Sequence, residues 1–394
     1  MRTKIMSIDI TEKLKAELWR YADSIDKEAL VRFLAGLYDK ESGGFYYSNS
    51  ARDNEGFYPD IESTAQAMTI LSSLGVYTLR DRGTDRCPEW YCEGLAKFFY
   101  ERQDEETGFF FDTQFGKDVN ESKKGRNTAQ ASTRLRELGV KPKYLLPAER
   151  VKVEKSVEVL ADHYSSLEKF DNWLRSMDWD SDDDFKPYYW GNMLAASKMS
   201  IETAGFLEYT RDFLDSIQNK ETGLWGKGLT SNAMNAAMKI SHLYDSAHKY
   251  PNVEKMIESI AEIVEREEPD VLSTLWNPLV LVQNILRDYG EIPDELRAVI
   301  DEKKLPLVKT CVDRMSVFKK PDGGYSYGRN NSSPTSQGAR VSLGLFEGDV
   351  NATMLGTASL LSSIAYVTCG EHEPPILKDY NRLFFELIEE KHKK

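Results

Sequence analysis

The sequence predicts an all-α protein in which six helical hairpins surround a central cavity, an (α/α)6 toroid, as a single domain over residues 1–394. Three observations predict it. A turn-plus-helix pattern recurs along the chain. Long segments between the turns carry apolar residues at three- and four-residue spacing, as amphipathic helices do. No segment shows the alternation of period two that strands require.

Each copy of the repeat joins a glycine–aromatic turn to a following helix rich in small residues. The intervals from Gly108 to Gly223 and from Gly223 to Gly324 are each about twice a repeat of roughly 50–60 residues. Each interval is therefore expected to contain one degenerate copy, near 170–190 and near 272–284. That makes six units between about residues 30 and 380. The four recognisable turns contain Gly44, Gly108, Gly223 and Gly324, and their helices lie in 60–75, 126–139, 231–244 and 349–365.

The predicted helices have recognisable ends and a reason to form a ring. Segments 89–103 and 253–267 are amphipathic, and Gly75, Gly139 and Gly290 stand where C-terminal caps are expected. Helix pairs of this kind stack only on their neighbours, so an open array leaves both ends exposed whereas a closed ring buries them. The first 30 residues are expected to add a further helix.

Composition excludes several classes of protein. The chain has 64 acidic residues and 51 Lys and Arg residues. The resulting net charge of −13 argues against nucleic acid or an anionic membrane as a partner. No apolar stretch approaches the length of a membrane span or a signal peptide. The four cysteines lack close pairs and suit free thiols in a reducing compartment. Dinucleotide, P-loop, zincin and nucleophile-elbow motifs are absent. We expect a cytoplasmic protein with no cofactor, no metal and no membrane span.

Some of the repeat residues carry a family resemblance. Thr64–Gly75 and Thr128–Gly139 fit the helix pattern T-A-x-A-x-x-x-L-x-x-L-G, and Gln218–Trp225 is similar to the Gln–Trp motif of triterpene cyclases. Residues 30–370 thus resemble the superfamily of terpenoid cyclases and protein prenyltransferase β-subunits. The resemblance implies a toroid and a metal-independent enzyme that acts on a ligand in the central cavity. Whether this chain needs a partner subunit stays open, since protein prenyltransferases require one.

Two catalytic signatures of that superfamily can be compared with the sequence. Prenyltransferases hold zinc with an Asp-x-Cys pair and a later His, but Asp349-Val350-Asn351 offers no thiolate and His372 alone restores no site. Class II cyclases protonate an alkene with the middle acid of D-x-D-D. That pattern is matched by 180–183, so Asp182 and Asp183 are candidate catalytic acids, since clustered carboxylates raise one another's pKa. The alternative, which the following Asp-Phe-Lys-Pro favours, is a solvated acidic loop.

The loops before the inner helices, with the first helical turns, are expected to surround one mouth of the cavity. Helix N-termini there favour an anionic group such as a diphosphate or a uronate. The candidate acids or bases are Asp60, Glu62 and Asp349, although Asp60 and Asp349 also suit plain N-caps. The candidate ligand-binding residues are Arg126, Asn127, Trp190, Asn232, Asn235, Trp276 and Asn351, with core packing as the alternative for the two tryptophans.

Three functions stay open at this point. A cyclase-like enzyme needs aromatic faces that guide a carbocation and few groups that quench it. The inferred rim is polar, which favours a polysaccharide lyase or inverting glycoside hydrolase using Asp60, Glu62 or Asp349 as acid or base. The third function is a toroidal binding module with no chemistry of its own.

Overall fold

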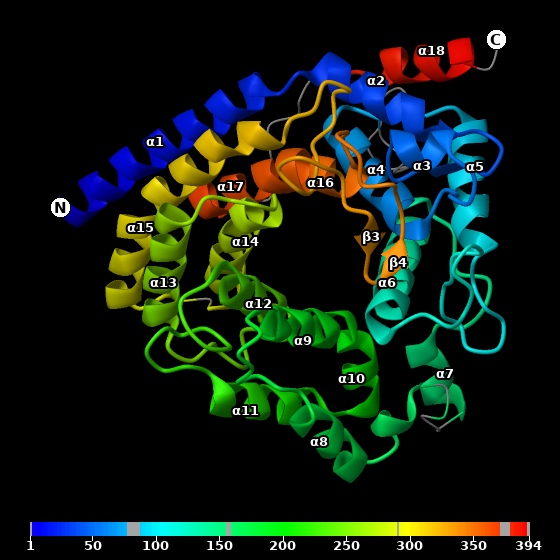
Figure 1. Cartoon of the computed structure of the whole chain (residues 1–394). Coiled ribbons are helices and arrows are strands. Elements are labelled where there is room, and N and C mark those ends of the chain that lie inside the picture. The colour runs from blue at the N-terminus through cyan, green and yellow to red at the C-terminus, as the bar shows by residue number, and fades with distance from the viewer. Residues whose placement is uncertain are drawn as a thin grey trace. The chain divides into compact units, whose positions relative to one another are not determined.

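The computed structural model describes residues 2–76, 87–154, 158, 160–289, 291–370 and 379–391, and most of these residues are helical (Figure 1). The described strands are two residues long and form two antiparallel pairs. The all-α prediction is therefore confirmed. The chain divides into two compact units, each made of separate segments: unit 1 comprises 1–21, 151–316 and 360–373, and unit 2 comprises 22–150, 317–359 and 374–394. The closed ring of six hairpins and the single domain stay predictions.

Unit 1 is a stack of helices. Helix α12 packs against both α9 and α14, α14 packs against α17, and α13 packs against α15 (Figure 1). Its elements are α1 (Arg2–Ser24, which runs past the boundary), η1 (Asp162–Tyr164), α8 (Leu167–Arg175), α9 (Phe185–Ala196), α10 (Lys198–Ala204), α11 (Leu207–Ile217), α12 (Ser231–Ser241), α13 (Val253–Arg266), α14 (Ser273–Asp288), α15 (Asp294–Arg314) and α17 (Leu360–Cys369). Helices thus stand where both degenerate copies are predicted.

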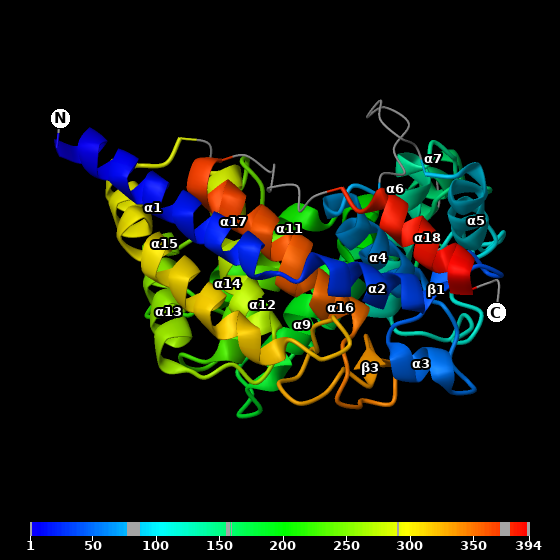
Figure 2. The ribbon, with the colours of Figure 1, turned by 90° about the horizontal axis from the view of Figure 1, so that it is seen from above.

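In unit 2, α4 packs against both α6 and α16, and α18 packs against α2 (Figure 2). Two further elements, α7 and η2, cross its boundaries. Its elements are α2 (Lys27–Leu37), β1 (Tyr38–Asp39), β2 (Gly44–Phe45), α3 (Asn49–Asp53), α4 (Ile61–Ser73), α5 (Glu89–Tyr100), α6 (Glu121–Glu137), α7 (Pro147–Glu154), η2 (Met315–Phe318), β3 (Thr335–Ser336), β4 (Ala339–Arg340), α16 (Val350–Met354), η3 (Leu355–Ser359) and α18 (Asn381–Lys391).

The repeat has a shared hydrogen bond in three of its copies. In each, the backbone N–H of an aromatic residue in the turn donates to the hydroxyl of a threonine in the following helix. A buried N–H that a strand would otherwise satisfy is thereby paired. The three bonds are Phe45 to Thr64 (3.0 Å), Phe110 to Thr128 (3.1 Å) and Tyr325 to Thr353 (2.9 Å).

In two copies the turn has two consecutive glycines, and the first of each pair is left-handed: Gly43 (φ 77°), before Gly44, and Gly323 (φ 93°), before Gly324. An added Cβ on Gly43 would stand 2.3 Å from the backbone oxygen of Gly94, so close packing as well as φ requires glycine there. In the other two copies, the predicted Gly108 and Gly223 are left-handed.

The two central copies also share a glutamine that ties the turn to a later segment. Each glutamine amide donates to a carbonyl of its own turn and to a carbonyl more than thirty residues further on. In the segment that is similar to the Gln–Trp motif, Gln218 thus connects its turn to Pro251. The bonds are Gln103 to Gly108 (3.1 Å) and Tyr144 (2.9 Å), and Gln218 to Gly223 (2.8 Å) and Pro251 (2.9 Å).

Two predicted helix ends are confirmed, and one helix start is wrong. Gly75 (φ 81°) and Gly139 (φ 71°) follow α4 and α6 in the left-handed conformation of a C-terminal cap. Gly290 lies outside the described residues. Helix α6 begins at Glu121, a turn earlier than expected from residue 126, because the Asn120 side chain accepts the Lys123 N–H at 2.8 Å.

One helix among the described residues, Val350–Cys369, is long and apolar enough to cross a membrane by length and composition. However, 72% of its most apolar window is buried inside the protein, as in the core helix of a soluble protein. This burial agrees with the expectation of no membrane span. A π-helical turn, η3, interrupts it between α16 and α17. The cytoplasmic location stays a prediction.

Candidate functional site

The N-terminus of α4 carries the first two candidate residues. Asp60 is its N-cap and accepts the Ser63 N–H at 2.9 Å and the Ser63 hydroxyl at 2.6 Å. Its side chain is buried, and burial, with Asp112 nearby, raises the pKa of Asp60 to about 6 against the opposing effect of Lys123. The capping alternative for Asp60 is therefore confirmed.

Glu62 lies in the first turn of α4 and is also buried. It pairs with the guanidinium of Arg126, lies 3.5 Å from the ammonium of Lys123, and accepts the Ser336 hydroxyl at 2.8 Å. Burial alone would raise the pKa of Glu62, but the two cations outweigh it and hold that pKa at about 2. Glu62 is thus charged at neutral pH, and both of its oxygens have partners.

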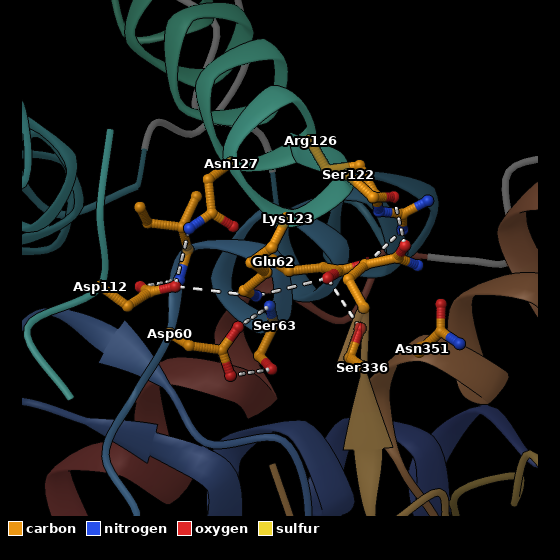
Figure 3. Close-up of polar contacts among 12 residues, drawn as sticks. Asp60, Glu62, Ser63, Asp112, Ser122, Lys123, Arg126, Asn127, Ser336 and Asn351 are labelled. Carbon is orange, nitrogen blue, oxygen red and sulfur yellow. Dashed lines mark hydrogen bonds and ion pairs between the residues drawn. The ribbon is translucent and has the colours of Figure 1, made fainter. Parts of the chain in front are cut away.

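Lys123 is the centre of this group. Its side chain is fully buried, and its ammonium lies 3.5 Å from Glu62, 3.7 Å from Asp112 and 5.4 Å from the ring centroid of Phe115 (Figure 3). Burial would lower the pKa of Lys123, but Glu62, Asp60 and Asp112 together raise it. Among the described residues none forms a hydrogen bond with this ammonium, although it carries three N–H donors.

Asp112 connects the turn of the second copy to two helices. One carboxylate oxygen accepts the Ile61 N–H at 2.8 Å, and the other accepts the Asn127 amide at 3.0 Å. The guanidinium of Arg102 lies 3.8 Å away. We call Asp60, Glu62, Asp112, Lys123 and Arg126 the ion cluster of unit 2.

A cavity of about 300 Å³ opens beside Lys123. One wall comes from the start of α6 and the loop before it, and the other from the β3–β4 hairpin. The cavity has two basic side chains and one acidic one, and its volume is at the lower end of about 300–1,000 Å³ for small-molecule sites. The lining residues that bear on binding are Phe115, Asp118, Asn120, Lys123, Gln337 and Arg340.

Asp349 is the buried N-cap of α16. One oxygen accepts the Ala352 N–H at 2.7 Å, and the other accepts the Tyr327 N–H at 2.8 Å. Burial raises the pKa of Asp349 to about 7 despite these donors. The capping alternative is confirmed here too, and Asp349 does not line the cavity.

Three further predicted residues of unit 2 also lie near α4. Arg126 and Asn127, in α6, contact Glu62 and Asp112 as described above. Asn351, in α16, accepts the side-chain amide of Gln66 in α4 at 3.0 Å. Arg126 thus connects α6 to α4 and Asn351 connects α16 to α4, whereas Asn127 bonds to Asp112 in the loop before α6.

The predicted acids of the D-x-D-D pattern belong to unit 1 and are exposed. The side chain of Asp182 is 99% exposed and pairs with Lys227 at 2.9 Å, which lowers the pKa of Asp182. Asp183 is exposed as well and accepts the Phe185 N–H at 3.1 Å. A carboxyl group that acts as a general acid needs a raised pKa, so the exposure and the lowered pKa of Asp182 favour the alternative of a solvated loop.

The remaining predicted residues are in unit 1, on α9, α12 and α14. Asn235 is buried and accepts the side-chain amide of Asn277 at 2.7 Å, while Asn232 is half-buried. Trp190 and Trp276 are half-buried, and their indole nitrogens find no hydrogen-bond acceptor among the described residues. Asn235 in α12 is thus connected to α14 through Asn277.

Three residues of the site are missing from the sequence prediction. Asp112 closes the Gly–aromatic segment of the second copy, so its position in the repeat was available as a signal. Lys123 falls in a first helical turn that was placed too late. Ser336 meets Glu62 from 274 residues away, and no local pattern indicates such a contact.

Among the described residues, no group of three or more His, Cys, Asp and Glu side chains could hold a metal ion. His372, considered with the zinc pattern, lies outside them. No family model matches the chain, and no match was found among curated proteins or solved structures.

Proposed function

We propose that this chain is a ligand-binding protein of the terpenoid cyclase and prenyltransferase type, an (α/α)6 toroid that holds a small organic anion in the cavity of unit 2. The observation that carries the proposal is that Lys123, whose ammonium is buried, is one of the residues that line the cavity. Its donors have no hydrogen-bond partner among the described residues. Buried donors are costly when unpaired, so an acceptor brought by a ligand or by water is favoured there.

The charge of the lining supports an anion over a cation. Lys123 and Arg340 are basic and Asp118 is acidic, while Asn120 and Gln337 add amide groups. Phosphate and carboxylate groups are the anions that ammonium and guanidinium donors bind best. An isoprenoid diphosphate and a uronate both carry such a group.

The buried acids support binding more than acid–base chemistry. Asp60 and Asp349 cap helices, and Glu62 is held in ion pairs, whereas a general acid must reach the substrate directly or through one water. A polysaccharide lyase or inverting hydrolase is the second candidate, and the pKa of Asp60 near 6 favours it. That chemistry would need Asp60, which is 1% exposed, to become accessible.

The test is a thermal-shift titration with inorganic pyrophosphate, an isoprenoid diphosphate and a galacturonate trisaccharide. A ligand at a hundred times its Kd adds about 2.7 kcal/mol of stability, which is readily measured. Arg340→Gln is expected to weaken pyrophosphate about fivefold, because an exposed charge pair contributes up to about 1 kcal/mol. Arg329→Gln, in the same loop but outside the cavity lining, is the control.

The outcomes separate the candidates. A shift with both diphosphates that Arg340→Gln weakens supports the proposal. A shift with the trisaccharide alone would favour a glycan enzyme. If no probe shifts the transition, or if both arginine variants act alike, the cavity does not bind small anions.

A further inference from the structure

The β3–β4 hairpin and the residues that flank it, Pro334–Val341, form one wall of the cavity; we call this segment the strap. Its two turn residues, Gln337 (φ 51°) and Gly338 (φ 82°), are both left-handed, as in the tight turns that join two short strands. A hairpin of two strands is at best marginally stable alone. The strap therefore depends on contacts with the rest of unit 2 for its position.

The tip of the strap forms three hydrogen bonds, two with the start of α6 and the loop before it and one with Glu62 in α4. The Ser122 hydroxyl donates to the side-chain oxygen of Gln337 at 2.6 Å, and the Asn120 amide donates to the Gln337 carbonyl at 2.8 Å. Ser336 donates to Glu62 at 2.8 Å (Figure 3). Asn120 is exposed and Gln337 is half-buried, so water competes for the bond between them, whereas Ser122 is buried.

The base of the strap is fixed far more firmly. Val341 is buried in an apolar cluster with Tyr47, Ala51 and Phe57. Just beyond it, the buried carboxylate of Glu347 accepts hydrogen bonds from the hydroxyls of Ser48 and Ser332 and from the N–H of Ser50. At the tip only the Ser336 bond has a charged acceptor, whereas the base combines an apolar cluster with a carboxylate that accepts hydrogen bonds from three serines, so the base is the more firmly held end.

We infer that the strap opens at its tip while its base stays in place, and that this opening controls access to the ammonium of Lys123. When the Gln337 and Ser336 bonds break, the wall formed by 337–340 moves away from the start of α6. A bound anion that contacts both Lys123 and Arg340 would hold the two walls together. The identity of that anion rests on the proposed function, whereas the opening does not.

Trypsin tests the opening directly, because Arg340 is on the strap and Arg329 lies before its base. Ser122→Ala removes the donor to Gln337 without altering the strap, and is expected to raise the rate of cleavage after Arg340 about fivefold, the worth of one hydrogen bond. Cleavage after Arg329 should not change. Ser132→Ala, which changes a half-buried serine on the same helix that bonds only to the Ala129 carbonyl among the described contacts, is the matched control.

Acetylation of the Lys123 amine, followed by mass spectrometry, measures access to the cavity. Ser122→Ala should accelerate this labelling by the same factor as cleavage after Arg340, while labelling of the exposed Lys117 stays constant. Saturating pyrophosphate should suppress both reactions. If Ser122→Ala leaves cleavage and labelling at wild-type rates, or accelerates both arginine sites equally, the strap does not open in this way.

The two proposals fail differently. If pyrophosphate gives no thermal shift, the proposed anion site fails, and the strap is judged from the rates measured without ligand. If pyrophosphate stabilises the protein but leaves cleavage and labelling unchanged, the site stands and control by the strap is wrong.

Discussion

The backbone N–H of Phe45 donates a hydrogen bond to the side-chain hydroxyl of Thr64, 3.0 Å away and nineteen residues later in the chain. Both residues are buried, and the bond joins β2 to the second turn of α4. Because the same bond recurs at Phe110 and Tyr325, it fixes the position of the Gly–aromatic turn on its helix in three of the copies.

Replacement of Thr64 by the isosteric valine is expected to destabilise the protein by about 1–3 kcal/mol, because it leaves the Phe45 N–H buried without an acceptor. Denaturant unfolding measures this change. Thr210→Val is the control, since the buried Thr210 hydroxyl donates only within its own helix, to Phe206 at 2.8 Å, and accepts no described N–H. Equal losses in the two variants would show that the recurring bond adds nothing.

Removal of the Arg126 guanidinium should leave Glu62 as a buried carboxylate with one cation fewer. Arg126→Met is expected to cost about 2 kcal/mol, less than the 3–5 kcal/mol of an isolated buried pair, because Lys123 and Ser336 remain. The exposed Arg136 on the same helix provides the matched control, Arg136→Met. Adding Glu62→Gln to Arg126→Met should recover part of the loss, and a strictly additive double variant would contradict the coupling.

The contribution of Asp349 to the free energy of unfolding should depend on pH with a sign that is unusual for a carboxyl group. Its pKa is raised to about 7 by burial, so the folded state binds a proton that the unfolded state has already lost above pH 4. Its contribution to stability is therefore full below pH 4 and declines as the pH rises to 7. The difference in unfolding free energy between the wild type and Asp349→Asn should shrink over that range. A difference that is constant, or that grows with pH, would contradict the raised pKa.

Glu62 should show the opposite trend. Its pKa is held at about 2, so its contribution is present above about pH 4.5 and is lost as the pH falls towards 2. The destabilisation caused by Glu62→Gln should therefore be largest at neutral pH and shrink in acid. Chemical denaturation of this variant and of Asp349→Asn at matched pH values measures both effects with one method. Parallel pH profiles would show that the two carboxyl groups do not differ as described.

Asp182 should be replaceable without consequence. Its side chain is 99% exposed and its partner Lys227 is exposed too, so Asp182→Asn is expected to leave the melting temperature and the pyrophosphate shift unchanged. Loss of ligand response or of any turnover in this variant would restore the D-x-D-D pattern as a catalytic acid.

Local patterns predicted much of the secondary structure and little of the site. Asp60 and Asp349 were recognisable as N-caps, because capping depends on residues within three positions. Glu62 and Arg126 were both named as candidates, but their ion pair depends on how α4 packs against α6. The link from Ser336 to Glu62 spans most of the chain, and tertiary packing alone creates it.

The error at the start of α6 had a direct effect on the site prediction. The small residues from 126 onward predict a start at Arg126, whereas the Asn120 cap starts the helix a turn earlier. Lys123 thereby faces Glu62 and Asp112 from inside a helix instead of from a loop. The polar stretch 120–125 resembles solvent-exposed sequence, whereas the lysine in it is buried and forms ion pairs with acids from two other segments.

The interleaving of the two units constrains how the protein can be made and divided. Unit 2 needs 317–359 to supply the strap, Glu347 and α16, yet the whole central segment of unit 1, 151–316, comes before them in the chain. During synthesis from the N-terminus, the hydrogen bonds of Ser48, Ser50 and Glu62 therefore cannot form until their partners, roughly three hundred residues later, have been synthesised. A fragment that stops before residue 317 would expose the polar surfaces these partners cover, and no single cut yields an intact half.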